Sequence, residues 1–394
     1  MIQRDLAPLL RKAATQYPVV AVTGPRQSGK TTLCRSEFPK HEYVSLEPLD
    51  EREFARTDPR GFIRKYAEGA VIDEVQNVPE LVSYLQGEVD DDPRPGRFVL
   101  TGSQHFGLSQ AISQSLAGRC GILHLLPPSL AELRRFGELP DRLSEVILTG
   151  SYPRIHDRGI APDRWLADYT ATYVERDVRS IAAVADLTTF TTFLRLAAGS
   201  TAQELNLTRL GGDAGVSSHT ARQWLSVLET SFLVTQLPSW HGNLKKRLVK
   251  RSKLHFLDSG LACNLLGITQ PGQLDHHPLR GAIFESWVAS EIYKQRVHAG
   301  LAPALHHLRA ISSIEVDLVL ERGKECALIE TKSGATVSSS FLSKLNQASA
   351  MLDEADTWRK PAKYLIHGGV TDHSQSDVRL IPWNAIDSVS WGDK

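Results

Sequence analysis

A glycine-containing turn near the N-terminus has the residues and the spacing of a phosphate-binding loop. It follows the apolar run Val19–Val22 and Thr23, and it consists of Gly24-Pro25-Arg26-Gln27-Ser28-Gly29-Lys30-Thr31-Thr32. Its glycines let backbone N–H groups curl around phosphate oxygens, and a helix beginning near Lys30 directs its positive dipole end at them. The Lys30 ammonium would reach the β- and γ-phosphates, and the Thr31 hydroxyl would ligate Mg²⁺. A turn that binds nothing is disfavoured, because all the diagnostic residues and the flanking strand are present.

An acidic pair ends a second predicted strand, which runs from Gly69 to Ile72. Asp73 would support the hydration shell of Mg²⁺ beside Thr31, and Glu74 would orient or deprotonate the attacking water. Such a pair is often only a solvated strand end, but the upstream loop favours the functional interpretation. The two motifs together predict nucleotide hydrolysis.

Two further residues are candidates for contact with the transferred phosphate. A third predicted strand, Phe98–Leu100, continues into Thr101-Gly102-Ser103-Gln104, which makes Ser103 a candidate γ-phosphate sensor. Arg119 could supply positive charge to the transition state, in its own subunit or in a neighbouring one. Each also has a structural interpretation, Ser103 in a strand-ending turn and Arg119 in a surface ion pair.

Carboxylates and a lysine alternate along two predicted strands near the C-terminus, 315–320 and 327–331. Because side chains alternate along a strand, Glu330 and Lys332 share a face, and a hairpin can bring Asp317 opposite them. Asp317 and Glu330 could then bind Mg²⁺, while the ammonium of Lys332 positions water or stabilises a pentavalent phosphate.

The same cluster has a structural interpretation. Charged and apolar residues commonly alternate on an edge hairpin, and Glu285 on a nearby predicted helix could simply pair with Arg280 or Lys294. His306 and His307 could likewise stabilise a strand without chemistry. Metal-dependent cleavage and simple binding are therefore both open.

Residues 213–225 predict a helix-turn-helix, in which the second helix can lie in a DNA major groove. The residues that can pack inward are Ala214, Val216, Ala221, Leu225 and Leu228. The residues that would face outward are Ser218, His219, Arg222 and Gln223. The basic stretch 244–253 could contact phosphates as a wing. Such modules also bind proteins or serve only as structure, so DNA is an unproven partner.

The elements that must position these side chains divide the chain into four regions. Residues 1–128 alternate apolar runs with helix-like stretches, as parallel βα units do. Residues 129–200 are predominantly helical and predict a lid. Residues 201–258 hold the helix-turn-helix with its basic neighbour, and residues 259–394 return to strands. The expected fold class is α/β.

Several motifs resemble a prokaryotic AAA-type ATPase family that carries a C-terminal nuclease-like domain. They are the loop 24–32, Val71-Ile72-Asp73-Glu74-Val75-Gln76, Leu100-Thr101-Gly102-Ser103, Ser115-Leu116-Ala117-Gly118-Arg119, and the segments 173–178 and 253–261. The resemblance, which spans nearly the whole chain, implies an AAA+ P-loop NTPase sheet with ATP and Mg²⁺ as ligands, and homo-oligomers.

A second resemblance concerns roughly residues 261–394. Asp317, Glu330 and Lys332 resemble the D…(D/E)-x-K motif of restriction-endonuclease-like nucleases, and Glu285 matches the helix-borne acid that sometimes completes it. This resemblance implies a nuclease-like domain after a winged-helix-like segment.

Composition limits the partners and the compartment. The 394 residues carry 45 basic and 45 acidic side chains, so binding to nucleic acid through bulk basicity is excluded. No run of about 18 apolar residues exists, and we expect a cytoplasmic protein with no membrane partner. Four widely separated cysteines without a CxxC predict neither disulfides nor a zinc site.

The leading hypothesis is an ATPase that couples its nucleotide cycle to DNA binding or processing by the C-terminal half. The alternative is an ATP-dependent switch whose nuclease-like domain, without catalysis, binds DNA or a protein. A small-molecule kinase is disfavoured, because no acceptor-binding lid is readable in the sequence.

Overall fold

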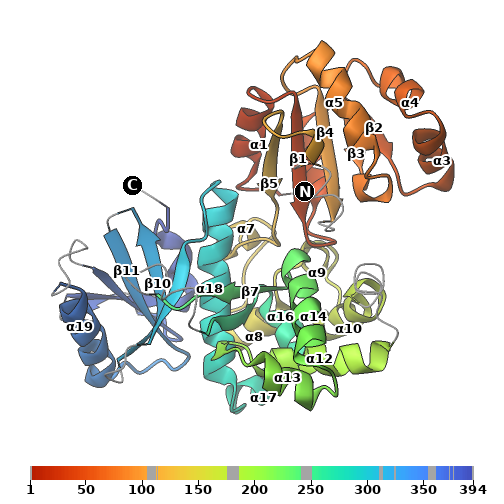
Figure 1. The fold of residues 1–394 in the computed structure, drawn as a ribbon. Coiled ribbons are helices and arrows are strands. Elements are labelled where there is room, and N and C mark those ends of the chain that lie inside the picture. The colour runs from red at the N-terminus through yellow and green to blue at the C-terminus, as the bar shows by residue number, and fades with distance from the viewer. Residues whose placement is uncertain are drawn as a thin grey trace. The chain divides into compact units, whose positions relative to one another are not determined.

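A computed structural model divides the chain into two compact units (Figure 1). It describes residues 2–103, 112, 114–174, 186–240, 251–309, 314–323, 325–353, 361–371, 373–375 and 377–392. The first unit comprises Met1–Pro128, Thr230–Phe232 and Val297–Gly300. The second unit comprises Ser129–Glu229, Leu233–Arg296 and Leu301–Lys394. The finer division into four regions stays a prediction.

The first unit contains a five-stranded sheet in which every strand pair is parallel. Its spatial order is β2 (Glu42–Ser45), β3 (Ala70–Asp73), β4 (Phe98–Ser103), β1 (Val19–Gly24) and β5 (Cys120–His124). All six residues of β1 are buried, which explains why this strand has a continuous apolar run. The strands predicted at β1, β3 and β4 are confirmed.

Helices cover both faces of this sheet. They are α1 (Ala7–Ala14), α2 (Lys30–Glu37), α3 (Leu49–Thr57), α4 (Pro59–Lys65) and α5 (Leu81–Asp91), with a 3-10 turn η1 (Val75–Asn77). Because side chains alternate along β1, Val20 and Val22 pack with α1 and α2, whereas Val19 and Ala21 pack with α3, α4 and α5. The phosphate loop is therefore anchored between two apolar cores.

The second unit begins with a helical region. Its described helices there are α7 (Leu130–Leu133), α8 (Leu143–Thr149), α9 (Pro153–Arg158), α10 (Pro162–Tyr169), η2 (Thr170–Val174), α12 (Leu187–Gly199), α13 (Leu207–Asp213), α14 (Ser218–Thr230), α16 (Ser259–Leu265) and α17 (Pro271–Asp275). Three strands on either side of α13 and α14 in the chain form an antiparallel sheet, in the order β6 (Gln203–Glu204), β8 (Lys253–Phe256) and β7 (Val234–Leu237). The segment 175–185, which includes most of one motif, lies outside the described residues.

The helix pair α13 and α14 has the burial pattern that the sequence predicts. Ala214, Ala221, Leu225 and Leu228 are buried in one apolar cluster, and Val216 packs against it. The four outward positions, 218, 219, 222 and 223, are exposed on α14. Residues 244–250 of the basic stretch lie outside the described residues.

A six-stranded mixed sheet forms the rest of the second unit. Its order is β13 (His373–Gln375), β14 (Val378–Pro382), β12 (Ala362–His367), β11 (Glu325–Lys332), β10 (Glu315–Arg322) and β9 (Leu305–Arg309). The long helix α18 (Arg280–His298) lies on one face and α19 (Ser339–Asp353) on the other (Figure 1). The strands predicted at β10, β11, β12 and β14 are confirmed.

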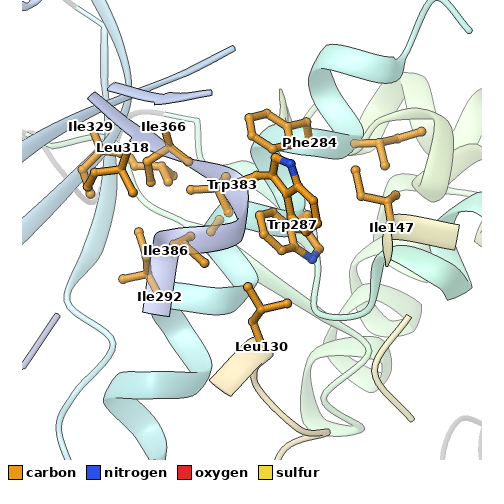
Figure 2. Close-up of a cluster of buried hydrophobic side chains, with 14 of the residues drawn as sticks. Leu130, Ile147, Phe284, Trp287, Ile292, Leu318, Ile329, Ile366, Trp383 and Ile386 are labelled. Atoms are coloured by element: carbon orange, nitrogen blue, oxygen red, sulfur yellow. The ribbon is translucent and has the colours of Figure 1, made fainter. Parts of the chain in front are cut away.

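The core under α18 is aromatic and aliphatic. Phe284 and Trp287 of α18 stack with ring centroids 5.9 Å apart, and Trp383 meets Trp287 edge-on. Figure 2 shows these rings beside Leu318 and Ile329 of the sheet. This core fixes the position of α18, and with it Glu285, against β10 and β11.

Candidate functional site

The loop between β1 and α2 requires glycine at both of its ends, Gly24 and Gly29. A Cβ on Gly24 would lie 2.1 Å from the backbone oxygen of Leu125, and Gly29 has a left-handed φ of +94°. Pro25, Arg26, Gln27 and Ser28 lie between them, and Lys30, Thr31 and Thr32 open α2. The order of strand, loop and helix is the one that the motif predicts.

Lys30 is held inside this loop. Its Nζ donates to the backbone oxygens of Gly24 (3.1 Å) and Pro25 (2.8 Å), and the residue is 6% exposed. Burial lowers the pKa of Lys30 to about 8, although the nearby Glu74 and Asp73 charges oppose the shift. A buried ammonium without a full counter-charge favours binding of an anion.

Asp73, at the end of β3, accepts hydrogen bonds from three side chains. The Thr31 hydroxyl lies 2.9 Å from Oδ2 and 3.1 Å from Oδ1. The Tyr43 hydroxyl donates to Oδ2 at 2.9 Å, and the Thr101 hydroxyl donates to Oδ1. The structure therefore brings together the two residues predicted as metal ligands, and a hydroxyl beside a carboxylate fits the oxygen preference of Mg²⁺.

Two of these partners of Asp73 were missed by sequence reasoning. Thr101 belongs to the motif Leu100-Thr101-Gly102-Ser103 on β4, the strand next to β3, so this motif could have indicated its contact with Asp73. Tyr43 belongs to no motif, and only the pairing of β2 with β3 brings it to Asp73. Burial and the charge of Asp73 raise the pKa of Tyr43 to about 12, so it stays a donor at neutral pH.

Glu74 follows Asp73 in an unusual backbone conformation. Its φ of +56° is left-handed, which is strained for a residue with a side chain, and it starts the turn η1. Its carboxylate accepts a hydrogen bond from the side-chain amide of Gln76.

Ser103 lies next to the loop, but Arg119 does not. Ser103 pairs in register with Gly24, and its buried hydroxyl has no hydrogen-bond partner among the described residues. Arg119 precedes β5 at the opposite end of the sheet, where its backbone oxygen accepts from the N–H of Val19. Its guanidinium donates to Asp90 at 2.9 Å. The expectation that Arg119 contacts phosphate in its own chain is wrong, because the length of β1 separates Arg119 from the phosphate loop. Contact of Arg119 with the nucleotide of a neighbouring copy stays a prediction.

Arg4 is another residue without a sequence signal. Its buried guanidinium donates to the backbone oxygen of Ser28 (2.8 Å) and to that of Leu126 (2.7 Å). It therefore ties the phosphate loop to the segment after β5. The Ser28 hydroxyl is buried without a partner among the described residues, which leaves one more donor in the loop.

In the second unit, Glu285 has a partner that the sequence did not indicate. The Nζ atom of Lys253, on β8, lies 3.0 Å from Glu285 Oε1 and 3.3 Å from Glu315 Oε1. The structural alternative named in the sequence analysis, a pairing of Glu285 with Arg280 or Lys294, does not occur in the structure. Lys294 pairs with Glu291 at 2.6 Å, one turn further along α18, and Arg280 donates to backbone oxygens.

The predicted triad is adjacent but already paired. Lys332 Nζ lies 2.7 Å from Glu330 Oε1, so these two share a face as predicted. Asp317 Oδ2 accepts from the N–H and the hydroxyl of Thr331, both at 2.8 Å. Burial and the charge of Asp317 raise the pKa of Glu330 to about 7. In the described part of the chain, no group of three or more His, Cys, Asp or Glu residues is placed to hold a metal ion.

Three segments of the chain match family models. Residues 16–134 match an AAA domain, residues 140–272 match a domain of unknown function (DUF8612), and residues 280–386 match another (DUF4143). Among the described residues, no helix has the length and apolarity needed to cross a membrane.

Two solved structures have a low similarity to this chain. The Walker-type ATPase PABY2304 of Pyrococcus abyssi has a TM-score of 0.46 and 14% identity, over 66% of this chain and 94% of that one. RuvB of Thermotoga maritima has a TM-score of 0.32 and 20% identity, over 59% of this chain and 87% of that one.

Curated relatives are closer in sequence. The uncharacterized proteins Rv2008c of Mycobacterium tuberculosis and Mb2031c of Mycobacterium bovis are each 31% identical over 325 residues, which is 81% of this chain and 71% of theirs. The chain therefore belongs to the family of these two mycobacterial proteins, and its residues 16–134 form an AAA domain of the P-loop ATPase class.

Proposed function

We propose that the protein binds ATP with Mg²⁺ at the loop 24–32 and hydrolyses it. The observation that carries this proposal is the placement of Thr31 and Asp73, whose oxygens lie 2.9 Å apart, at the start of the helix that also holds the buried Lys30. Hydroxyl, carboxylate and ammonium are the groups that a Mg²⁺-bound polyphosphate needs. Their common position at the carboxyl end of a parallel sheet supports the same conclusion.

Each residue then has a distinct role. Thr31 and Asp73 would hold the cation, which when bound neutralises developing charge on the β- and γ-phosphate oxygens. Lys30 exchanges its contacts with the Gly24 and Pro25 oxygens for phosphate oxygens. Glu74 orients or deprotonates the attacking water, and Ser103 donates its unsatisfied hydroxyl to the γ-phosphate.

The test is phosphate release from ATP by the full chain in Mg²⁺, compared with the Lys30→Ala variant. Loss of the Lys30 ammonium should lower the rate at least about 100-fold, because electrostatic stabilisation of this kind contributes a few kcal/mol. Lys12→Ala is the matched control, since Lys12 lies exposed on α1 and away from the loop. A rate that survives Lys30→Ala would assign the hydrolysis to another site or to a contaminant.

We further propose that DNA bound by the exposed polar face of α14 modulates this hydrolysis. The support is the exposed polar face of α14, which presents His219 and Arg222 beside a buried apolar face. DNA should raise the phosphate-release rate several-fold, and Arg222→Ala should reduce that rise. Arg209→Ala on α13 is the control, because this exposed arginine already faces Asp213 at 3.6 Å.

If hydrolysis ignores single- and double-stranded DNA alike, the second unit is a protein-docking module and the molecule is a nucleotide switch. The pairing of Lys253 with Glu285 favours a second unit that binds without cleaving. Nicking of DNA in Mg²⁺ or Mn²⁺ that Asp317→Ala and Glu330→Ala both abolish would instead establish a nuclease.

A further inference from the structure

Four carboxylates of the second unit gather where α18 meets β10 and β11. This acid cluster consists of Glu285, Glu315, Asp317 and Glu330. Glu285 and Glu330 are buried, at 9% and 3% exposure, whereas Asp317 is half-buried and the Glu315 side chain is 45% exposed. Buried carboxylates at such close range repel one another strongly, and a cation must offset the repulsion.

That cation is supplied by a different element. Lys253 is the first residue of β8, which belongs to the three-stranded sheet, and it is 5% exposed. Its Nζ contacts Glu285 and Glu315 directly, at 3.0 and 3.3 Å. Although burial opposes it, the charges of Glu285, Asp317 and Glu315 raise the pKa of Lys253 above its ordinary value. The lysine is therefore held as a charged ammonium.

The carboxylates of the cluster already have partners. Lys253 Nζ lies at ion-pair distance from Glu285 Oε1 (3.0 Å) and from Glu315 Oε1 (3.3 Å). Asp317, the residue that a metal would need most, has its Oδ2 turned to the N–H and hydroxyl of Thr331. Glu330 has a lysine of its own, Lys332.

We propose that Lys253 is the built-in cation of the acid cluster, that its ammonium occupies the place of a divalent metal ion, and that it excludes one. The acid cluster is thereby metal-free, and an ion pair in it joins β8 to α18 and β10. This proposal concerns the second unit alone and does not depend on ATP hydrolysis by the first.

The test is Mn²⁺ binding by the full chain without nucleotide, followed through the electron paramagnetic resonance signal of free Mn²⁺. The wild type and Asp317→Asn should bind Mn²⁺ equally, because the wild-type acid cluster has no Mn²⁺ site. In Lys253→Met, which keeps the length of the side chain without its charge, binding should tighten at least about tenfold, because the repelling charge is gone. Adding Asp317→Asn to Lys253→Met should abolish the new site, and Lys253→Arg should behave as wild type.

Two results would overturn the proposal: a wild-type Mn²⁺ site that depends on Asp317, or a folded Lys253→Met variant that binds no more Mn²⁺ than the wild type. If Lys253→Met does not fold, Mn²⁺ binding by the wild type and by Asp317→Asn still tests the proposal, because a weaker binding in Asp317→Asn would overturn it. The phosphate-release assay on the same proteins keeps the two proposals separate, because Lys30→Ala removes hydrolysis without touching the acid cluster.

Discussion

At the residue scale, Asp73 organises the nucleotide site. Its two oxygens receive hydroxyl groups from Thr31, Tyr43 and Thr101, which come from α2 and from the strands on either side of β3. Hydrogen bonds to both oxygens of a carboxylate fix its orientation. The position of the proposed Mg²⁺ ligand is thus set by its neighbours as much as by its own rotamer.

Removing one of these neighbours should weaken the proposed metal site. In Tyr43→Phe we expect the Mg²⁺ concentration for half-maximal ATP hydrolysis to rise about 10-fold, because loss of a group that orients a metal ligand typically costs about 10- to 100-fold in metal affinity. The maximal rate should change less than this. Tyr84→Phe is a matched control, since Tyr84 is another partly exposed tyrosine, on α5. An equal shift in both variants would show that Tyr43 does not act through Asp73.

Gly24 has no room for a side chain. The added methyl group of Gly24→Ala would overlap the backbone oxygen of Leu125, so β5 or the loop must move. We expect nucleotide binding to be lost, measured with a fluorescent ATP analogue. Gly87→Ala is the contrasting control, because a Cβ there meets nothing within 4 Å on the helix α5. It should stabilise the first unit by about 0.5–1 kcal/mol and leave binding unchanged.

At the element scale, β10 contains a bulge that decides where Asp317 lies. The register with β9 shifts between Val316 and Val319. Both valines consequently pack in the core with α19, although they are three residues apart, whereas Leu318 faces the core with α18. A bulge re-aims side chains at the edge of a regular ladder, which places Asp317 between Glu285 and Glu330. Both of these carboxyl groups feel its charge.

Truncation of a buried side chain on the central strand β11 should lower the stability of the second unit. Ile329 is fully buried between β10 and β12 and faces α18 (Figure 2). Ile329→Ala should lower the free energy of unfolding by about 2–5 kcal/mol through lost burial and the cavity left behind. Val370→Ala is the control, because Val370 is 71% exposed and should cost under about 0.5 kcal/mol. Urea unfolding followed by tryptophan fluorescence measures both.

At the scale of the whole molecule, the aromatic reporters are distributed unevenly. All seven tryptophans, from Trp165 to Trp391, belong to the second unit, and the first unit has none. Tryptophan fluorescence therefore follows the second unit alone. This separation matters because a chain of two units need not unfold in one step.

Acid should remove the contribution that the buried histidines make to the stability of the second unit. Burial lowers the pKa of His255 to about 3, and it also lowers the pKa of His156 and of His307. Between the ordinary value of about 6.5 and pH 3, the unfolded chain binds a proton at His255 and the folded chain does not. The contribution of His255 is therefore full above pH 6.5 and falls by about 1.4 kcal/mol per pH unit below it. The lowered pKa values of His156 and His307 act in the same direction.

The measurement is urea unfolding by tryptophan fluorescence between pH 7.5 and 4.5, for the wild type and for His255→Leu. The variant should lose less stability on acidification than the wild type does. An identical pH slope in the two proteins would contradict the assignment. Comparison of slopes removes any constant cost of repacking at position 255.

The sequence by itself determined the local part of this protein. The loop 24–32, the strands β1, β3, β4, β10 and β11, and the inward face of α14 could all be predicted. Each is encoded by residues close in the chain, through glycine backbone freedom or through the 2.0- and 3.6-residue periods of strands and helices.

Only the tertiary structure decided which side chains meet across the chain. Three contacts join elements far apart in sequence: Tyr43 with Asp73, Arg4 with the phosphate loop, and Lys253 with Glu285. The separation of Arg119 from the phosphate loop likewise follows from the strand order. Such pairings depend on strand order, a bulge and helix packing, which no local periodicity specifies. When a charged side chain is buried, it needs a counter-charge. The fold decides which residue supplies that counter-charge.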